Sequence, residues 1–326
     1  MTTAKPGGPQ RVTIHEVGPR DGLQNEERKL SVADRVRLIG ALADAGLRRI
    51  EVGSFVRPDW IPQLADTDEV VRGLPSLRLP AEVQLSAIVP NRRGLERALA
   101  AGLRGVAVFM SASEAHNQKN TNKSIADSLR EFGALVPQAL AAGLWVRGYL
   151  SVVWGCPYEG HVSPRRVMEI AGELRSLGCH EISLGDTIGV GNPRQTQEIV
   201  SLLLGGGSGS AGQTVAPFAP QELALHLHDT HGTALANCLA GHELGARTFD
   251  TAIGGTGGCP YAPGAPGNLA TEDLVSMFND MGVETGVDLG KLLEAGVLAQ
   301  ELLGHKLTGR RLQAELGRRE KSVARH

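Results

Sequence analysis

The sequence predicts an α/β protein folded as a closed (β/α)8 barrel, or TIM barrel, with extra C-terminal helices. The chain has 326 residues, a normal length for one such barrel. A unit of amphipathic helical pattern, glycine and β-rich run recurs along it, and eight β-rich runs can be counted. Strands that alternate with helices are parallel and joined by right-handed crossovers, and eight of them favour a closed barrel. The alternative is an open doubly wound sheet, which usually carries an early GxGxxG turn, and none follows the first strands here.

Each element of the repeat has a local signal. Helical patterns such as SVADRVRLIGALADAG open on a serine, a preferred N-cap residue. A glycine then stands where a helix needs a left-handed C-cap before the next strand, at Gly46, Gly102, Gly143, Gly178 and Gly245. The expected strands are residues 12–17, 49–55, 83–89, 105–110, 146–153, 181–186, 223–229 and 249–255.

The repeat also sets the domain organisation. We expect a disordered N-terminus over residues 1–10, a barrel domain with a C-terminal helical extension over 11–305, and a basic tail over 306–326 that forms a solvated helix end. The Gly-, Ser- and Pro-rich segment 203–222 lies on the helix-to-strand side, away from the expected active face. We interpret it as a flexible insertion without a catalytic role.

The composition disfavours several functional classes. Lys and Arg number 33 against 35 Asp and Glu, with no basic stripe in the body of the chain, which argues against nucleic acid as a partner. The 4 cysteines show no CxxC spacing and favour a reducing compartment. No apolar run approaches the ~20 residues that cross a bilayer, and MTTAKPGGPQ at the N-terminus has no signal-peptide pattern. We therefore expect a soluble, cytoplasmic protein without membrane or nucleic-acid partners. We also expect a homo-oligomer, although the composition does not indicate the oligomeric state.

Three histidines fall within six positions in LALHLHDTHG, residues 223–232. Their alternation with leucines predicts a β-strand on which His226 and His228 project from the same face. Two neighbouring imidazoles on an apolar strand are either buried core histidines or a metal pair, and their place at a strand end favours the metal. His231 follows the strand and is interpreted as a loop residue.

Barrel closure should bring further ligands to this histidine pair. Chemistry in a TIM barrel lies at the C-terminal ends of the strands, and strands seven, eight and one become neighbours. The loops after these strands carry Asp21, in VGPRDGLQ, and Asn268, in GAPGNLATED. With two imidazoles they form an N2O2 set, which lacks the thiolates of structural zinc and suits Mg²⁺, Mn²⁺ or Co²⁺. The sequence thus predicts a divalent-cation site made by Asp21, His226, His228 and Asn268.

Four more residues are candidates for this site. Arg20 is either a surface or ion-paired arginine or a fixed cation beside the metal, and its Gly-Pro-Arg-Asp-Gly turn favours the fixed cation. Glu51 should point inward from strand two, as an ion-pair partner of Arg20 or as a catalytic group. Cys259 is either a buried inert cysteine or a functional thiol on a mobile lid, which the surrounding glycines favour. Asp186, at the end of strand six, is a hydrogen-bond acceptor behind the site or a turn residue.

The sequence resembles the 3-hydroxy-3-methylglutaryl-CoA (HMG-CoA) lyase family over about residues 11–305. The segment GGCPYAPGAPGNLATED is highly specific, whereas RDG and HxH are shared with wider metal-dependent aldolase and synthase relatives. The resemblance implies a TIM barrel that cleaves HMG-CoA to acetyl-CoA and acetoacetate with a divalent cation, Mg²⁺ or Mn²⁺, and the family suggests leucine degradation. The motifs that carry it are EVGPRDGLQNE, IEVGSFV with PDWIPQLADT, SASE with QKN, RGYLSVVWGCPYEG, EISLGDTIGVG, LHLHDTHG with ALAN, and GGTGGCPYAPGAPGNLATEDLV.

The resemblance also implies roles for individual residues. It implies metal ligation by Asp21, His226, His228 and Asn268. It implies catalytic roles for Arg20, Asp21, Glu51, His226 and Cys259. It implies contacts with an acyl-CoA substrate from Arg20, Gln24, Asn120, Tyr149 and Asp186.

The expected chemistry is a retro-aldol or Claisen-type cleavage. The C3 hydroxyl loses its proton while C2 leaves as the thioester enolate, and a cation at the hydroxyl lowers its pKa. Arg20 stabilises negative charge on the thioester oxygen, Glu51 positions Arg20, and Cys259 is the candidate acid for the enolate carbon. The base is left open among His226, Asp21 and a metal-linked water.

Four positions depart from the family pattern, and two other functions stay open. Because His116, Lys123, Trp154 and Pro266 differ from the residues expected there, the substituent at C3 of the substrate is open. A lyase for a related 3-hydroxyacyl-CoA is therefore an alternative, as is a condensing relative of the isopropylmalate or homocitrate synthase type. A barrel that only binds metal or acyl-CoA is disfavoured by the intact set of candidate residues.

Overall fold

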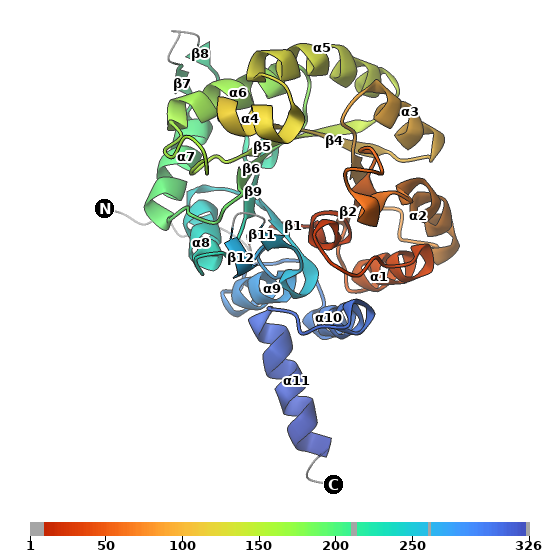
Figure 1. Ribbon diagram of the computed structural model, residues 1–326. Helices are drawn as coiled ribbons and strands as arrows, with labels where there is room; N and C mark the ends of the chain where they lie inside the picture. The colour runs from red at the N-terminus through yellow and green to blue at the C-terminus, as the bar shows by residue number, and fades with distance from the viewer. Residues whose placement is uncertain (1–9, 210–213, 260–261, 324–326) are drawn as a thin grey trace.

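The computed structural model describes residues 10–209, 214–259 and 262–323. Within them, eight parallel strands form a closed barrel in the order β1-β10-β9-β6-β5-β4-β3-β2 (Figure 1). The predicted TIM barrel is confirmed, and every expected strand has a counterpart. The barrel strands are β1 (Thr13–Glu16), β2 (Arg49–Ser54), β3 (Gln84–Ile88), β4 (Gly105–Ser111), β5 (Trp145–Ser151), β6 (Glu181–Asp186), β9 (Leu223–Leu227) and β10 (Thr248–Thr251).

Helices surround this barrel, and apolar side chains between strands and helices form the main core. Ser31 and Ser124 cap two of them as predicted, because their side chains accept hydrogen bonds from the N–H groups of Asp34 and Asp127. Ser163 precedes α6 without such a hydrogen bond. The helices up to β10 are α1 (Val32–Asp44), α2 (Thr67–Gly73), α3 (Arg92–Ala100), α4 (Glu114–Thr121), α5 (Ile125–Ala141), α6 (Pro164–Ser176), α7 (Pro193–Gly205) and α8 (Ala234–Leu244).

The five glycines expected at the helix ends all have positive φ angles. Gly46 shows why no other residue fits well, since its φ is +103° and a Cβ there would lie 2.4 Å from the carbonyl oxygen of Gly286. The helix-to-strand turns, which lie at the amino-terminal ends of the barrel strands, therefore depend on glycine, as the sequence predicts.

The segment expected to be a flexible insertion has regular structure in its described part. After α7, β7 (Gly207–Ser208) pairs with β8 (Thr214–Val215) in an antiparallel hairpin. Val215 and Phe218 are buried, and Val215 lies against α6. These residues pack on the outside of the barrel, away from the carboxyl ends of its strands.

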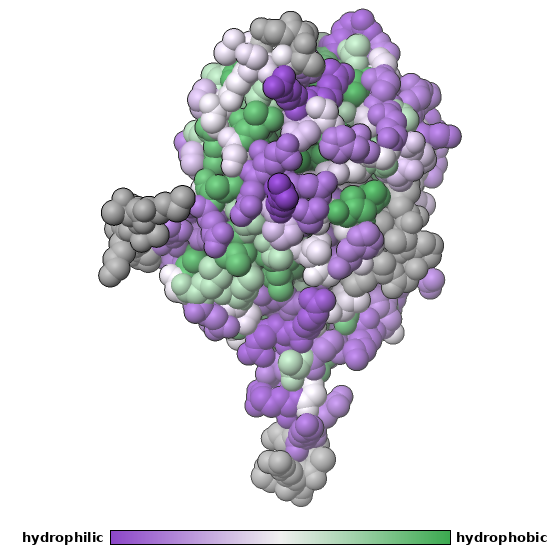
Figure 2. Space-filling view, turned by 90° about the vertical axis from the view of Figure 1, so that its left-hand side faces the viewer, coloured by the Kyte–Doolittle hydropathy of each residue, from purple (hydrophilic) through white to green (hydrophobic). Residues whose placement is uncertain are grey.

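Three α-helices follow β10 in the described residues and complete the C-terminal part. They are α9 (Thr271–Asp280), α10 (Leu289–Leu303), which packs on α1, and α11 (Arg310–Val323). The Asp273 carboxylate accepts hydrogen bonds from the N–H groups of Arg310 and Arg311, at 3.0 and 2.6 Å, and so fixes the start of α11. From there α11 extends away from the barrel (Figure 1), and the surface of this projection is mostly hydrophilic (Figure 2).

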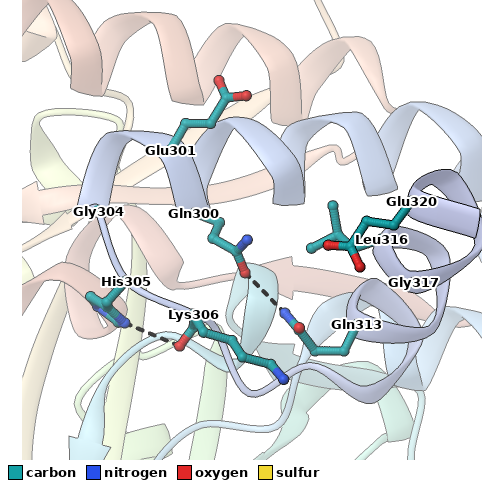
Figure 3. A pocket seen from close by; sticks show the side chains of 9 residues that line it. All are labelled: Gln300, Glu301, Gly304, His305, Lys306, Gln313, Leu316, Gly317 and Glu320. Atoms are coloured by element: carbon teal, nitrogen blue, oxygen red, sulfur yellow. Dashed lines mark hydrogen bonds between the residues drawn. The ribbon is translucent and has the colours of Figure 1, made fainter. Parts of the chain in front are cut away.

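A pocket of about 510 Å³ lies where α10 and α11 meet (Figure 3). Gln300 and Gln313 face one another across it and share a hydrogen bond of 2.9 Å. The strand ends of the barrel contribute no lining residue to this pocket, so the chemistry has to be sought elsewhere. None of the described helices is long and apolar enough to span a bilayer.

Candidate active site at the barrel mouth

Arg20 and Asp21 lie on a single π-helical turn, Gly18–Gly22, directly after β1. Buried Glu16 holds this turn, because its Oε1 accepts hydrogen bonds from the N–H groups of Gly18 (2.8 Å) and Ile253 (2.9 Å). Its Oε2 accepts a third from the hydroxyl of Thr271, at 2.6 Å. Burial raises the pKa of Glu16 to about 7, although all three hydrogen bonds oppose the shift. Glu16 thus joins the turn to the segment after β10 and to α9.

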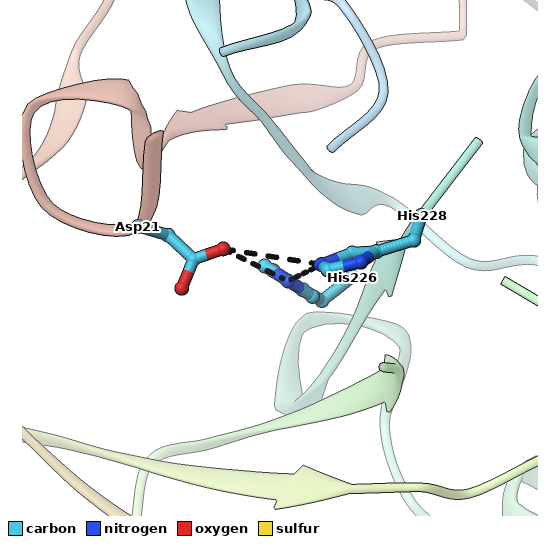
Figure 4. A group of neighbouring side chains, drawn as sticks. All are labelled: Asp21, His226 and His228. Carbon is cyan, nitrogen blue, oxygen red and sulfur yellow. Dashed lines mark hydrogen bonds and ion pairs between the residues drawn. The ribbon is translucent and has the colours of Figure 1, made fainter. Parts of the chain in front are cut away.

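The two strand histidines face Asp21, as Figure 4 shows. Nε2 of His226 lies 3.4 Å from Nε2 of His228, and these atoms are 3.8 and 3.9 Å from Oδ2 of Asp21. The strand period and the closure of the barrel therefore bring these three residues together as predicted. Burial, followed by the neighbouring His226, lowers the pKa of His228 to about 4, so its imidazole is neutral near pH 7.

These three side chains fit a divalent cation. One donor atom from each lies within 4.8 Å of the others, and none is a thiolate. Burial alone would raise the pKa of Asp21, but Arg20 and the two histidines outweigh it and hold that pKa well below its ordinary value. An ionised carboxylate and a neutral imidazole are the forms that metals bind.

Asn268 reaches the same place from the segment after β10. Its Nδ2 donates hydrogen bonds to Oδ2 of Asp21 (2.9 Å) and to the carbonyl of Thr256 (3.2 Å). Its backbone also forms a β-bridge with His228. In this orientation the amide nitrogen, and not the oxygen expected as a ligand, faces Asp21.

Arg20 is buried and held by two carboxylates. Its Nε donates to Glu51, its Nη1 donates to Asp21, and its guanidinium carbon lies 5.3 Å from the centre of the Tyr149 ring. Burial disfavours its charged form, but Asp21 and Glu51 outweigh this effect and raise the pKa of Arg20. Burial likewise raises the pKa of Glu51, which Arg20 offsets in part. Glu51 points inward as expected, and it makes the expected ion pair with Arg20.

A cavity of about 350 Å³ opens above these groups. One side, the polar wall, consists of Arg20, Asp21, His226 and His228. The other side, the apolar wall, consists of Val56, Ile88 and Phe109, at the ends of β2 to β4. Three residues expected to contact substrate, Gln24, Asn120 and Tyr149, also line the cavity.

Asp186 and Cys259 are two further residues expected at the site, and Asp186 is not among the described residues that line this cavity. Asp186 is buried beside the cavity, and its two oxygens accept hydrogen bonds from the N–H groups of Val190 (3.1 Å) and Gly191 (2.9 Å). Burial raises its pKa to about 6 despite these bonds. This is the arrangement of a turn residue. The backbone of Cys259 ends strand β11 (Gly258–Cys259), but the expected position of its thiol lies outside what the structure describes.

The four residues that we expected to depart from the family pattern lie in different settings. His116 lines the cavity and shares a hydrogen bond of 2.7 Å with the hydroxyl of Ser111. Lys123 pairs with Glu131, and Trp154 is buried. The backbone of Pro266 ends strand β12 (Ala262–Pro266), and its side chain is outside the described part of the molecule.

Sequence reasoning missed two groups at this site. One is the apolar wall, whose residues have no chemical signature of their own. The other is Asp250 on β10, whose Oδ2 lies 3.2 Å from Nδ1 of His226. A weaker form of the signal that pointed to Glu51 was present in FDT at 249–251, where a carboxylate lies within an expected strand next to Phe249.

The fold and the site together define a TIM-barrel enzyme with a metal-binding arrangement at its mouth. The HMGL-like family model matches residues 11–298. The hydroxymethylglutaryl-CoA lyase of Pseudomonas mevalonii is 49% identical over 97% of this chain and 100% of its own length. The chain belongs to the HMGL-like family and is a lyase, which confirms the resemblance seen in its sequence.

Two more relatives bear on the substrate. A protein of Pseudomonas aeruginosa, named as a 3-hydroxy-3-isohexenylglutaryl-CoA/hydroxymethylglutaryl-CoA lyase, is 46% identical over 95% of this chain and 99% of its own. The solved structure of an HMG-CoA lyase from Acinetobacter baumannii in complex with coenzyme A and 3-methylmalate has a TM-score of 0.85. It is 38% identical and covers 93% of this chain and 95% of its own.

Proposed function

We propose that the protein cleaves HMG-CoA to acetyl-CoA and acetoacetate with a divalent cation held by Asp21, His226 and His228. The observation that carries this proposal is the meeting of these three side chains beside Arg20, in a cavity at the mouth of a lyase-family barrel. Asn268 would be the fourth ligand after rotation of its amide by 180°, which exchanges its nitrogen and oxygen. Mg²⁺ and Mn²⁺ suit this mixture of nitrogen and oxygen donors.

The proposed reaction breaks one carbon–carbon bond and transfers two protons, one from the C3 hydroxyl to a base and one from an acid to C2, after which a proton returns from the base to the acid through solvent. The C3 hydroxyl loses its proton, C3 becomes the ketone of acetoacetate, and the C2–C3 bonding pair leaves as the thioester enolate. A proton on C2 then completes acetyl-CoA. A divalent cation at the site would supply Lewis acidity that lowers the pKa of the hydroxyl.

Arg20 is the group that we assign to the enolate. Among the described residues its Nε and Nη1 are taken by Glu51 and Asp21, which leaves Nη2 for the substrate. An arginine fixed on two sides is already oriented toward the negative charge that develops on the thioester oxygen. Glu51 is in this scheme a positioning residue for Arg20.

The proton donor and the proton acceptor are assigned from the chemical properties of the candidate side chains. We assign Cys259 as the acid that protonates C2, because a thiol with an ordinary pKa of ~8.5 carries its proton near neutral pH. The hydroxyl proton would pass to Asp21 or to His226, which line the cavity, and His226 could accept it only while its Nε2 does not hold the cation. Gln24, Asn120 and Tyr149 would bind the acyl part of the substrate.

The direct test is an assay of HMG-CoA cleavage, with and without EDTA, followed by readdition of Mg²⁺ or Mn²⁺. We expect acetoacetate only with metal. The variant Cys259→Ala should lower turnover strongly while leaving Mn²⁺ affinity nearly unchanged. Cleavage that is unaffected by EDTA would contradict the metal assignment, and a Cys259→Ala variant with full turnover would remove Cys259 from the reaction.

A second candidate substrate class is favoured by a specific cavity. A side pocket of about 140 Å³ adjoins the active-site cavity and shares Val56, Trp60 and Phe109 with it. Pro90 and Phe132 add further apolar surface to this side pocket. It offers room for an apolar C3 substituent longer than methyl, the kind of group named for the relative from P. aeruginosa.

This candidate is tested by a series of 3-hydroxyglutaryl-CoA thioesters that carry hydrogen, methyl or a six-carbon alkenyl chain at C3. Similar kcat/KM values for methyl and alkenyl substrates would support use of the side pocket. A kcat/KM for the alkenyl substrate at least about a hundredfold lower, the discrimination that a closed pocket gives, would restrict the enzyme to HMG-CoA.

A further inference from the structure

A buried carboxylate lies directly behind one of the two histidines. Asp250 is on β10, and the register of the barrel pairs it with His226 on β9 and with His15 on β1. Its Oδ2 is 3.2 Å from Nδ1 of His226 and accepts a hydrogen bond of 2.9 Å from the hydroxyl of Ser183. The carboxylate therefore contacts the imidazole on the side away from Asp21.

Asp250 is itself fixed by an arginine inside the barrel. Nη2 of Arg147 donates to its Oδ1 at 2.6 Å, and the Arg147 side chain has no exposed surface. Arg147 is held in turn by Glu181, at 3.0 Å, and by the hydroxyl of Tyr149, at 3.0 Å. With both oxygens engaged, the carboxylate has one orientation available, and its charge is compensated by Arg147.

This geometry gives the two histidines different environments. A neutral imidazole has one N–H donor and one acceptor nitrogen, and a carboxylate only accepts. Nδ1 of His226 must therefore donate to Asp250, which leaves the lone pair on Nε2. Within the described part of the chain, Nδ1 of His228 is buried without a hydrogen-bond partner, so nothing comparable orients His228.

We propose that Asp250 is a positioning residue that keeps His226 in its Nδ1–H form and aims Nε2 at the point shared with Asp21 and His228. This inference rests on the proposed metal site and deepens it. A carboxylate partner of this kind fixes the ring and makes the ligating nitrogen more basic, and its loss typically lowers metal affinity about 10–100-fold. The sequence left Asp186 as either an acceptor behind the site or a turn residue, and the structure places Asp250 against His226.

The substitution Asp250→Asn is a sharp test because it is isosteric. Arg147 can only donate, so the amide oxygen stays toward Arg147 and the amide nitrogen faces His226. An amide nitrogen donates, and Nδ1 of His226 must then accept. The proton moves to Nε2, the atom that should face the metal. The matched control is Ser183→Ala, which removes another partner of the same oxygen and leaves the carboxylate in place.

Two measurements on the full chain, freed of metal by chelation, test the effect of these substitutions on the tautomer of His226 and on metal affinity. Two-bond ¹H–¹⁵N spectra of ¹⁵N-histidine-labelled protein report the tautomer of His226, whose signals are assigned by their loss in His226→Gln. Titration with Mn²⁺ alone, followed by the EPR signal of free Mn²⁺, reports affinity. We expect the Nδ1–H form in the unsubstituted protein and in S183A, the Nε2–H form in D250N, and Mn²⁺ binding about 10–100-fold weaker in D250N only.

The possible outcomes separate this inference from the proposed function. An Nε2–H tautomer in the unsubstituted protein overturns it without any variant, even if D250N does not fold. Equal Mn²⁺ affinity in D250N and the unsubstituted protein overturns it as well. If the unsubstituted protein has the Nδ1–H tautomer but binds no Mn²⁺, the orienting role of Asp250 holds and the proposed metal site fails.

Discussion

The two walls of the active-site cavity are built on different principles. On the polar wall several side chains are held by others: Arg20 by Glu51 and Asp21, and His226 by Asp250. On the apolar wall, Val56, Ile88 and Phe109 form a small cluster with Tyr149, separate from the main core. Apolar contacts are not directional, so this wall fixes a shape but no single orientation.

The contrast assigns a different task to each wall. Bond cleavage needs groups in one geometry, and on the polar wall that geometry is fixed before substrate arrives. Substrate choice depends on the space that remains, which the apolar wall and the side pocket determine. Changes on the polar wall should therefore affect catalysis for every substrate, whereas changes on the apolar wall should alter the ratio between substrates.

The largest effect is expected for His228→Ala. It removes a proposed ligand, so Mn²⁺ affinity should fall by more than the roughly 10–100-fold typical of an outer partner, and turnover should fall in parallel. His231→Ala is the matched control, since it changes an exposed histidine of the same motif that does not line the cavity. Calorimetric Mn²⁺ titration and HMG-CoA cleavage measure the two quantities, and an unchanged Mn²⁺ affinity in H228A would refute the role of His228.

A smaller loss, confined to the chemical step, is expected for Arg20→Lys. Lysine keeps the charge but lacks the planar group that contacts Glu51 and Asp21 and that would contact the substrate in the proposed reaction. We expect kcat to fall about 10²–10³-fold, the range for loss of one oxyanion donor, with Mn²⁺ affinity within a few-fold of the unsubstituted protein. Steady-state kinetics at saturating metal measures it. A change in KM alone would place Arg20 in binding and not in charge stabilisation.

The polar wall could largely be foreseen from the sequence, and the apolar wall could not. Asp21, His226 and His228 carry chemistry in their side chains, and the adjacency of strands seven, eight and one follows from barrel closure. Val56 and Phe109 resemble core residues in sequence, because an apolar side chain has the same signature whether it faces a helix or a cavity.

The hydrogen bonds behind the polar wall also could not be predicted from the sequence. The pairing of Asp250 with His226 depends on the register between β9 and β10, which the sequence does not specify. Asp186 was expected either behind the site or in a turn. Its contact with the turn depends on the path of the loop that brings the N–H group of Gly191 to its carboxylate, which the sequence does not specify. Periodicity tells which face a side chain occupies, but not which neighbour it meets.

On the apolar wall, Val56→Phe should change selectivity. The added ring would occupy the junction between the cavity and the side pocket, so the alkenyl substrate should lose about tenfold or more in kcat/KM relative to HMG-CoA. Val56→Ile, which adds a single methylene, should give a smaller change in the same direction. Competition assays with both thioesters read the ratio. Equal losses for both substrates would show that the side pocket holds a part that they share, such as the pantetheine arm.

The smallest effect on turnover, and a distinct effect on stability, is expected for Glu16→Gln. Burial raises the pKa of Glu16 from 4.5 in the unfolded chain to about 7, so the folded protein binds the extra proton between these values. Stability from this group is present at low pH and is lost as the pH rises through 7, by up to about 1.4 kcal/mol per pH unit.

Glutamine copies the protonated form, because its oxygen can accept from Gly18 and Ile253 while its nitrogen donates to Thr271. The free energy of unfolding of E16Q should therefore rise relative to that of the unsubstituted protein as the pH rises from 4.5 to about 7, and the difference should stay level at higher pH, as measured by urea denaturation. Neighbouring Glu272, whose pKa burial raises to about 8, titrates in both proteins and largely cancels in the difference. A difference that does not vary with pH would mean that Glu16 is ionised throughout, and that it braces the Arg20–Asp21 turn as a carboxylate.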